Sequence, residues 1–186
     1  RIGLGRKELR RVIRESHGDR GIECVSGALA KYTRCELPTA QHVLERGMEP
    51  IVLEAGPQVG HAVRQWSHVP LFSPWEYAID KASERLLVAA GWNSPAPDQY
   101  PTGGELLAQY LEPLATRTKL SEHIQTNARV VSIARAEFDK VKSAGREKSP
   151  FEIRYQNGKG PSTVRADAVI DASGTWDAPN PAGVNG

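Results

Sequence analysis

The hydrophobic pattern of the chain is clearest at residues 50–56, Pro-Ile-Val-Leu-Glu-Ala-Gly, where three apolar residues lead into an acidic residue and then a glycine. A short apolar run bounded by turn-forming residues predicts a buried parallel strand. Residues 39–47 predict the tail of a helix, because Ala40, Val43 and Leu44 stand at helical spacing and a glycine closes the segment. This order of elements is typical of the second half of a dinucleotide-binding βαβ unit.

Glu54 is the residue that this pattern singles out. In such a unit the carboxylate at the end of the second strand accepts hydrogen bonds from a ribose, and Glu54 would be that carboxylate. The same position also fits an exposed glutamate that ends an ordinary strand. The residues by themselves leave both interpretations open.

Two helix starts follow, each with a capping-box pattern. Residues 73–76, Ser-Pro-Trp-Glu, predict a start with serine as the N-cap, proline in the first helical position and glutamate three residues after the cap. An apolar face then continues to Ala89, and Gly91 is the predicted end of this helix. Residues 102–105, Thr-Gly-Gly-Glu, predict a second helix, which Pro113 should bend or end.

Three segments after these helices predict strands. Residues 127–136 form the first, and residues 151–156 alternate cleanly between apolar and polar positions. Residues 163–172 form the third, with an Asn-Gly turn signal before it. The third segment becomes fully apolar at residues 168–170, as expected of a strand that enters a central sheet. Helices combined with such strands predict an α/β fold.

The N-terminal segment follows none of these patterns. Residues 6–17 predict a basic helix with a narrow apolar stripe, which is typical of a solvated face and, less often, of an element that binds phosphate or a membrane surface. Residues 18–38 show no clear periodicity. We therefore expect residues 1–38 to be an unassigned basic segment and residues 39–186 to form a partial nucleotide-binding domain.

Composition narrows the class of protein. The formal net charge of +2 implies no nucleic-acid partner, and no apolar run approaches the ~20 residues that a membrane span needs. Cys24 and Cys35 fit no metal or redox spacing, which favours a reducing, cytoplasmic location. The chain begins at Arg1 and its only methionine is Met48, so we expect a piece of a longer protein or an incompletely translated reading frame.

Four motifs stand in order along the chain, at residues 42–56, 100–105, 127–130 and 166–176. Together they resemble the FAD-dependent pyridine-nucleotide oxidoreductases, especially the flavin-containing monooxygenase-like group. The first resembles that group's first helix, second strand and ribose-binding glutamate, and the second its helix before the flavin-side strands. The third resembles the strand whose valine backbone touches adenine. The last, which ends Ala-Ser-Gly-Thr-Trp, resembles the group's Ala-Thr-Gly strand end followed by tryptophan.

The resemblance implies a Rossmann-like FAD-binding domain, built from a parallel sheet and a three-stranded antiparallel β-meander and incomplete at its N-terminus. It implies FAD as the cofactor and NADPH as the hydride donor, with the NADPH-binding domain outside this chain. The cofactor-binding residues that it implies are Glu54, Gly56, Arg64, Trp66, Val130, Ala172, Gly174 and Trp176.

Each implied role has a physical reason and an ordinary alternative. Gly174 would let the backbone approach the cofactor closely, because it has no side chain. Arg64 would pair with phosphate, and Trp66 would lie beside the flavin ring. Trp176 would stack on the cofactor or on a neighbouring strand. The alternatives are a solvated arginine and tryptophans that serve packing. The sequence identifies no catalytic acid, base or nucleophile, since lone loop histidines such as His61 and His68 are more often solvated residues.

The glycine-rich phosphate loop of the group is missing where it is expected. Counting back ~20 residues from the acidic residue puts Lys31, Thr33 and Glu36 at the three glycine positions, with no apolar strand before them. A glutamate there would place negative charge near the pyrophosphate. A frame error or a fused foreign segment would explain residues 1–38.

Three hypotheses on function follow. The first is the FAD-binding portion of an NAD(P)H-dependent flavin oxidoreductase or monooxygenase that acts on a small organic substrate. The second is a non-catalytic remnant of that family that no longer binds FAD tightly. The third is a nucleic-acid-binding module in which residues 6–17 contact the nucleic acid. The mildly acidic remainder of the chain argues against this hypothesis.

Overall fold

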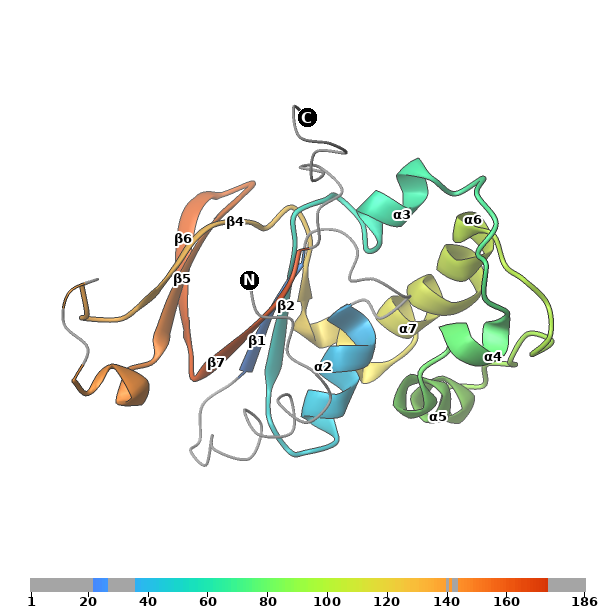
Figure 1. The fold of residues 1–186 in the computed structure, drawn as a ribbon, viewed down its shortest axis with the longest axis horizontal. Coiled ribbons are helices and arrows are strands. Elements are labelled where there is room, and N and C mark those ends of the chain that lie inside the picture. Colours follow the sequence, from blue (N-terminus) through green and yellow to red (C-terminus); the bar gives the residue numbers. More distant parts are fainter. Residues whose placement is uncertain (1–21, 27–35, 140, 142–143, 174–186) are drawn as a thin grey trace, which may run out of the picture.

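Two β-sheets and a group of helices form the described part of the chain (Figure 1). The structure, a computed structural model, describes residues 22–26, 36–139, 141 and 144–173. In Figure 1 the antiparallel sheet lies on the left, the parallel sheet in the middle and most of the helices on the right. The parallel sheet is therefore the element that joins the other two parts.

The parallel sheet has the strand order β3-β2-β1-β7, and each neighbouring pair in it is parallel. Its strands are β1 (Ile22–Ser26), β2 (Pro50–Glu54), β3 (Ile124–Gln125) and β7 (Ala168–Ala172). The buried parallel strand predicted within residues 50–56 is confirmed. The predicted entry of residues 168–170 into a central sheet is confirmed as well.

Strand β1 corrects the interpretation of the N-terminal segment. No apolar strand is predicted before the expected glycine loop, yet residues 22–26 pair with β2 on one side and with β7 on the other. The five residues of β1 include a glutamate and are too few to show a strand periodicity in the sequence. Only the pairing with β2 and β7 identifies this segment as a strand. The sheet thus reaches into residues 1–38, while the predicted basic helix at residues 6–17 lies outside the described residues.

Helix α2 (Glu36–Leu44) leads into β2 through a glycine turn. Gly47 has a φ of 72°, in the left-handed region. Its N–H donates to the carbonyl of Leu44 at 3.0 Å, and the N–H of Met48 donates to the carbonyl of Val43 at 3.3 Å. These two hydrogen bonds form a Schellman motif. The predicted helix tail and its glycine end are confirmed.

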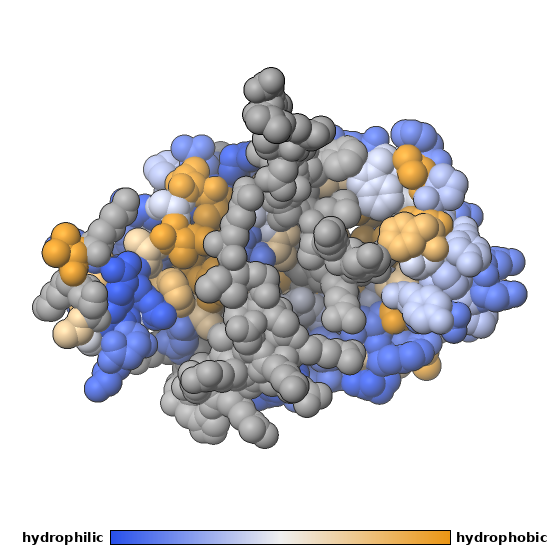
Figure 2. Space-filling view, viewed as in Figure 1, coloured by the Kyte–Doolittle hydropathy of each residue, from blue (hydrophilic) through white to orange (hydrophobic). Residues whose placement is uncertain are grey.

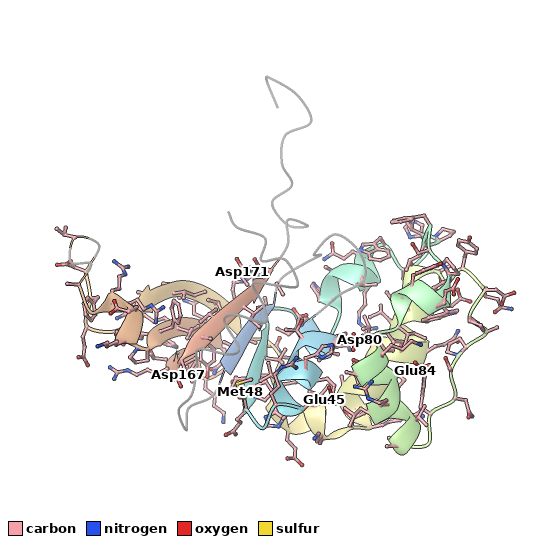
Figure 3. The ribbon with its side chains drawn as sticks, turned by 60° about the horizontal axis from the view of Figure 1, so that its bottom comes forward. Glu45, Met48, Asp80, Glu84, Asp167 and Asp171 are labelled. Atoms are coloured by element: carbon pink, nitrogen blue, oxygen red, sulfur yellow. The ribbon has the colours of Figure 1, made fainter. Side chains whose placement is uncertain are left out.

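Helix α5 (Lys81–Ala89) lies beside α2, and charged side chains join the two (Figure 3). The Nε2 atom of His42 lies 3.2 Å from Oδ2 of Asp80, and Nη2 of Arg85 lies 2.8 Å from Oε1 of Glu45. Partly exposed ion pairs of this kind each contribute little stability.

The single helix predicted for residues 75–89 is wrong, because the structure divides it in two. Helix α4 (Trp75–Ala78) has Pro74 as its N-cap, and no side chain caps it, so the first predicted capping box does not form. Asp80 then accepts hydrogen bonds from two following N–H groups and begins α5 anew. An aspartate that caps a helix start in this way competes with continuation of the preceding helix. Gly91 follows the end of α5 as predicted, with a φ of 78°.

The second predicted capping box is confirmed. The Thr102 hydroxyl accepts a hydrogen bond from the N–H of Glu105, and the Glu105 carboxylate accepts one from the N–H of Thr102. Three segments follow without a break, namely α6 (Gly103–Leu106), the π-helical segment η1 (Leu107–Leu111) and α7 (Glu112–Thr116). Pro113 therefore does not end the helix, and the regular hydrogen bonding changes in the π-helical turn just before it.

The antiparallel sheet has the order β4-β5-β6, from β4 (Arg129–Arg135), β5 (Phe151–Asn157) and β6 (Gly160–Ala166). The three-stranded meander implied by the resemblance is confirmed. The predicted single strand at residues 163–172 divides at Asp167 into the end of β6 and the whole of β7. Apolar residues gather on the surface over this sheet (Figure 2), and Val131 and Ile133 of β4 are exposed.

Two buried clusters lie on opposite sides of β2. The larger one contains Val52 and fills the space toward the helices, where Tyr110 and Leu114 are fully buried. The smaller one joins Leu53 to Ile153 on the side of the antiparallel sheet. Because successive residues of β2 face different clusters, both faces of the strand are buried, which explains its uninterrupted apolar run.

Candidate functional site

Three strands of the parallel sheet end at one edge, and the strand register places two candidate residues there. Ser26 at the end of β1 is the partner of Glu54 on β2 and of Ala172 on β7. The carboxyl ends of parallel strands are where open α/β sheets bind their ligands. Glu54, Gly56 and Ala172 therefore belong to the edge of the sheet at which a dinucleotide would lie.

The Glu54 side chain is held at this edge and is not a surface group. Glu54 is only 8% exposed, and its Oε1 accepts a hydrogen bond from the N–H of Gly56 at 2.8 Å. Its main-chain carbonyl accepts another from the N–H of Ala128 at 2.9 Å. The alternative of an exposed glutamate is thus wrong, and the role of the carboxylate toward a ribose stays a prediction.

Gly56 shapes the turn that follows β2. A Cβ atom at this position would lie 2.3 Å from the Cβ of His61, so only glycine allows the first residue of α3 (His61–Gln65) to pack here. The carbonyl of Gly56 accepts a hydrogen bond from the N–H of Asn127 at 2.8 Å. This contact brings the beginning of the antiparallel sheet to the same edge, including the half-buried Val130.

Arg64 and Trp66 make their contacts with the helices. Arg64 forms an ion pair with Glu112 of α7, between Nη2 and Oε1 at 2.5 Å. Trp66 packs on the start of α6, where a Cβ added to Gly103 would lie 2.7 Å from the indole. The Nε atom of Arg64 and the Nε1 atom of Trp66 are buried with no hydrogen-bond partner among the described residues. Their roles toward a phosphate and a flavin stay predictions.

The remaining candidates are placed only in part. Gly174 and Trp176 lie outside the described residues. Ser173, just before them, donates its N–H to Oδ1 of Asp171 at 2.9 Å. Among the residues that the structure describes, no three His, Cys, Asp or Glu side chains gather as a metal site, and no helix is long and apolar enough to cross a membrane.

Strand β1 also shows where a phosphate loop should be sought in the sequence. The residues directly after β1 are Gly-Ala-Leu-Ala-Lys-Tyr, at positions 27–32, so Gly27 stands at the first glycine position. Leu29 and Tyr32 stand at the second and third. The window that begins at Lys31 therefore starts too late. Glycines on both sides of a short, partly apolar stretch, Gly21 and Gly27, were the signal that could have located this strand.

Comparison with solved structures shows which proteins share this fold. Bacillithiol disulfide reductase Bdr (YpdA) from Bacillus cereus matches 89% of this chain, with a TM-score of 0.61 and 19% sequence identity. An oxidised steroid monooxygenase bound to NADP matches 84% of the chain, with a TM-score of 0.58 and 23% identity. OTEMO in complex with FAD and NADP also matches 84%, with a TM-score of 0.56 and 17% identity.

These likenesses establish a shared fold. The chain spans 43% of the length of the reductase and 26% of each of the other two proteins. No protein-family description matches the sequence, and no curated protein does. The resemblance to the FAD-dependent pyridine-nucleotide oxidoreductases, predicted from four sequence motifs, is confirmed at the level of the fold.

Proposed function

We propose that this chain is the FAD-binding portion of an NAD(P)H-dependent flavin oxidoreductase or monooxygenase that acts on a small organic substrate. The observation that carries the proposal is the buried Glu54 carboxylate at the carboxyl edge of a parallel sheet. The fold that the chain shares with FAD- and NADP-bound OTEMO supports it. NADPH would act as hydride donor from a part of the protein outside this chain.

The described residues fit the adenosine end of FAD. Glu54 would accept hydrogen bonds from the ribose, and the segment from Asn127 to Val130, which bonds to the turn after β2, would border the adenine. At the pyrophosphate the sequence offers one glycine, Gly27, where the usual loop has three. When bound, FAD supplies the redox chemistry, and the protein supplies binding and orientation. The chain's own contribution is therefore to hold the cofactor by its nucleotide end.

Direct measurement of FAD affinity tests this proposal. We expect the purified chain to bind FAD and the Glu54→Gln variant to bind it about tenfold more weakly, since hydrogen bonds to a charged acceptor contribute about 1.5–3 kcal/mol. Glu49→Gln is the matched control, because Glu49 is exposed and lies beside the opposite end of β2. Isothermal titration calorimetry of all three proteins gives the answer. Equal affinity of the Glu54→Gln variant and the wild type would remove Glu54 from the site.

The second candidate is a non-catalytic remnant of the same fold that does not hold FAD tightly. Leucine and tyrosine at the second and third glycine positions favour it, because their side chains hinder close approach to a pyrophosphate. The same titration separates the two candidates. A dissociation constant of about 1 μM or tighter excludes the remnant, and a colourless protein that takes up no flavin excludes the enzyme portion.

A further inference from the structure

A second site lies on the helical side of the sheet edge. A cavity of about 530 Å³ is bordered by the loop after β2, by α3, by the end of α7 and by β3. This volume is in the range of small-molecule pockets. Its polar wall includes Gln58, Arg64, Glu112, Arg117 and Thr126, and its apolar wall includes Val59, Pro113 and Ile124. An apolar wall with a few charged groups is the composition expected of a ligand site.

The position of Arg64 in this wall is fixed from two sides. Gly60 precedes α3 with a φ of 66°, and a Cβ there would lie 2.4 Å from Cδ2 of Leu107, so α3 begins in close contact with η1. At the other end of the side chain, Glu112 holds one nitrogen of the guanidinium. Glu112 itself follows the π-helical segment directly, and π-helical turns occur frequently at functional sites.

The guanidinium of Arg64 has donors left for a ligand. Its Nη2 bonds to Glu112, and no other hydrogen bond of this side chain is formed among the described residues. The Arg117 side chain is exposed and has no ion pair or hydrogen bond within the same part of the chain. Two arginines against one glutamate leave the cavity wall with an excess of one positive charge.

The last carbonyl groups of a helix normally repel a nearby anion. At the end of α7 this repulsion is reduced, because hydrogen-bond donors already occupy several of these groups. Here the carbonyl of Glu112 accepts from the Thr116 hydroxyl at 2.7 Å, and that of Leu114 accepts from the Thr118 hydroxyl at 2.6 Å. The carbonyl of Pro113 accepts from the N–H of Arg117 at 2.9 Å. Three carbonyl groups near this end of the helix are therefore already occupied.

We propose that this cavity binds a small organic carboxylate, with the carboxylate on Arg64 and Arg117 and the apolar body against Val59 and Ile124. A planar carboxylate matches the paired donors of a guanidinium, which a free amide or an alcohol does not. The site goes beyond the proposed function, because Arg64 is the one residue of this wall that also stands among the cofactor-binding residues implied by the resemblance. It requires neither FAD nor NADPH to be present.

Calorimetric titration of the purified chain with benzoate, and with benzamide as the neutral molecule of the same shape, tests the proposal. We expect saturable binding of one benzoate per chain and about tenfold weaker binding of benzamide. The Arg117→Gln variant, altered at an exposed position that does not affect folding of the core, should bind benzoate about tenfold more weakly. Lys119→Gln, a nearby exposed cation outside the cavity wall, should bind it as the wild type does.

Three results would overturn the proposal. The first is no saturable benzoate binding up to about 10 mM, and the second is equal binding by the wild type and the Arg117→Gln variant. The third is loss of benzoate binding in Glu54→Gln or its one-for-one displacement by FAD, which would assign the ligand to the dinucleotide edge. Failure of the chain to bind FAD leaves the benzoate result intact, so the two proposals fail separately.

Discussion

The indole nitrogen of Trp92 donates a hydrogen bond to the main-chain carbonyl of Gln109 at 2.6 Å. Four residues farther on stands Pro113, which has no N–H with which to bond that carbonyl. A tryptophan from a loop thus supplies a donor where the proline removes one from the helix.

Replacing Trp92 should therefore cost more than the lost packing. Trp92→Phe removes the indole N–H, so the Gln109 carbonyl loses this donor. We expect the free energy of unfolding to fall by about 1–3 kcal/mol more than it does when a tryptophan without such a bond is changed to phenylalanine. Trp66→Phe is the matched control, since the Trp66 indole nitrogen has no partner within the described residues. Urea unfolding of both variants measures the difference. Equal losses would show that the indole hydrogen bond contributes nothing.

Gly56→Ala should destabilise the turn at the candidate site. The new methyl group would lie 2.3 Å from the Cβ of His61 and force α3 away from the strand end. Overpacking of this kind costs about 1–3 kcal/mol. The control is Gly158→Ala, because nothing lies within 4 Å of a Cβ at Gly158. A thermal melt in which both variants behave alike would contradict the close packing of Gly56 on His61.

Gly47→Ala should weaken the end of α2 through backbone strain alone. Gly47 has a φ of 72°, and a Cβ there would meet no atom within 4 Å. The left-handed conformation costs an alanine about 1–2 kcal/mol. Asparagine tolerates this conformation better, so Gly47→Asn should lose less stability than Gly47→Ala in chemical denaturation. The reverse order would rule out strain as the cause.

Acid should destabilise the protein partly through Asp80. Burial raises the pKa of the Asp80 carboxyl, but the N–H groups of Ser83 and Ala82 and the ring of His42 lower it by more, so the pKa lies below its usual value of 3.8. A carboxyl whose pKa is lower in the folded state contributes stability above its unfolded pKa and loses it as the pH falls through the folded pKa.

The Asp80→Asn variant isolates this effect. Asparagine can still cap α5 but does not titrate, so the variant should lose less stability than the wild type when the pH falls below about 4. Denaturation curves recorded from neutral pH downward give the two profiles. Asp98→Asn, which removes an exposed carboxylate from a loop, is the control. Parallel profiles for Asp80→Asn and the wild type would exclude Asp80 as a source of the acid sensitivity.

The sequence predicted those parts of the fold whose signals are local. The Thr102–Glu105 capping box depends on two residues three positions apart, and both of its hydrogen bonds are found. The glycine ends at Gly47 and Gly91 depend on the conformation of one residue each, and both have a positive φ. A signal of this kind is complete within a few residues, so the rest of the chain has little influence on it.

The serine capping box at residues 73–76 was an equally local signal, and it does not form. Of Ser73 and Asp80, it is Asp80 that caps a helix with its side chain, by accepting from the N–H groups of Ala82 and Ser83. Two candidate caps so close together compete for the same helical segment. The local sequence pattern does not show whether Ser73 or Asp80 is the stronger cap. The prediction from it was therefore one helix where the structure has two.

The parts that the sequence did not predict depend on distant residues. Strand β1 is defined by its pairing with β2 and β7, neither of which its own five residues reveal. The ion pair of Arg64 with Glu112 and the packing of Trp66 on Gly103 likewise join elements far apart in the chain. Residue type alone could propose a phosphate or flavin contact at these positions, but it could not show which helices they touch.

The pairing of β1 with β7 also limits the order in which the protein can fold. Ile22 is the partner of Ala168, so one central strand lacks its second neighbour until the ribosome has added every other strand of both sheets. Contacts between such distant positions are slow to form. Until β7 emerges, the nascent chain carries an open strand edge that chaperones or other chains can engage.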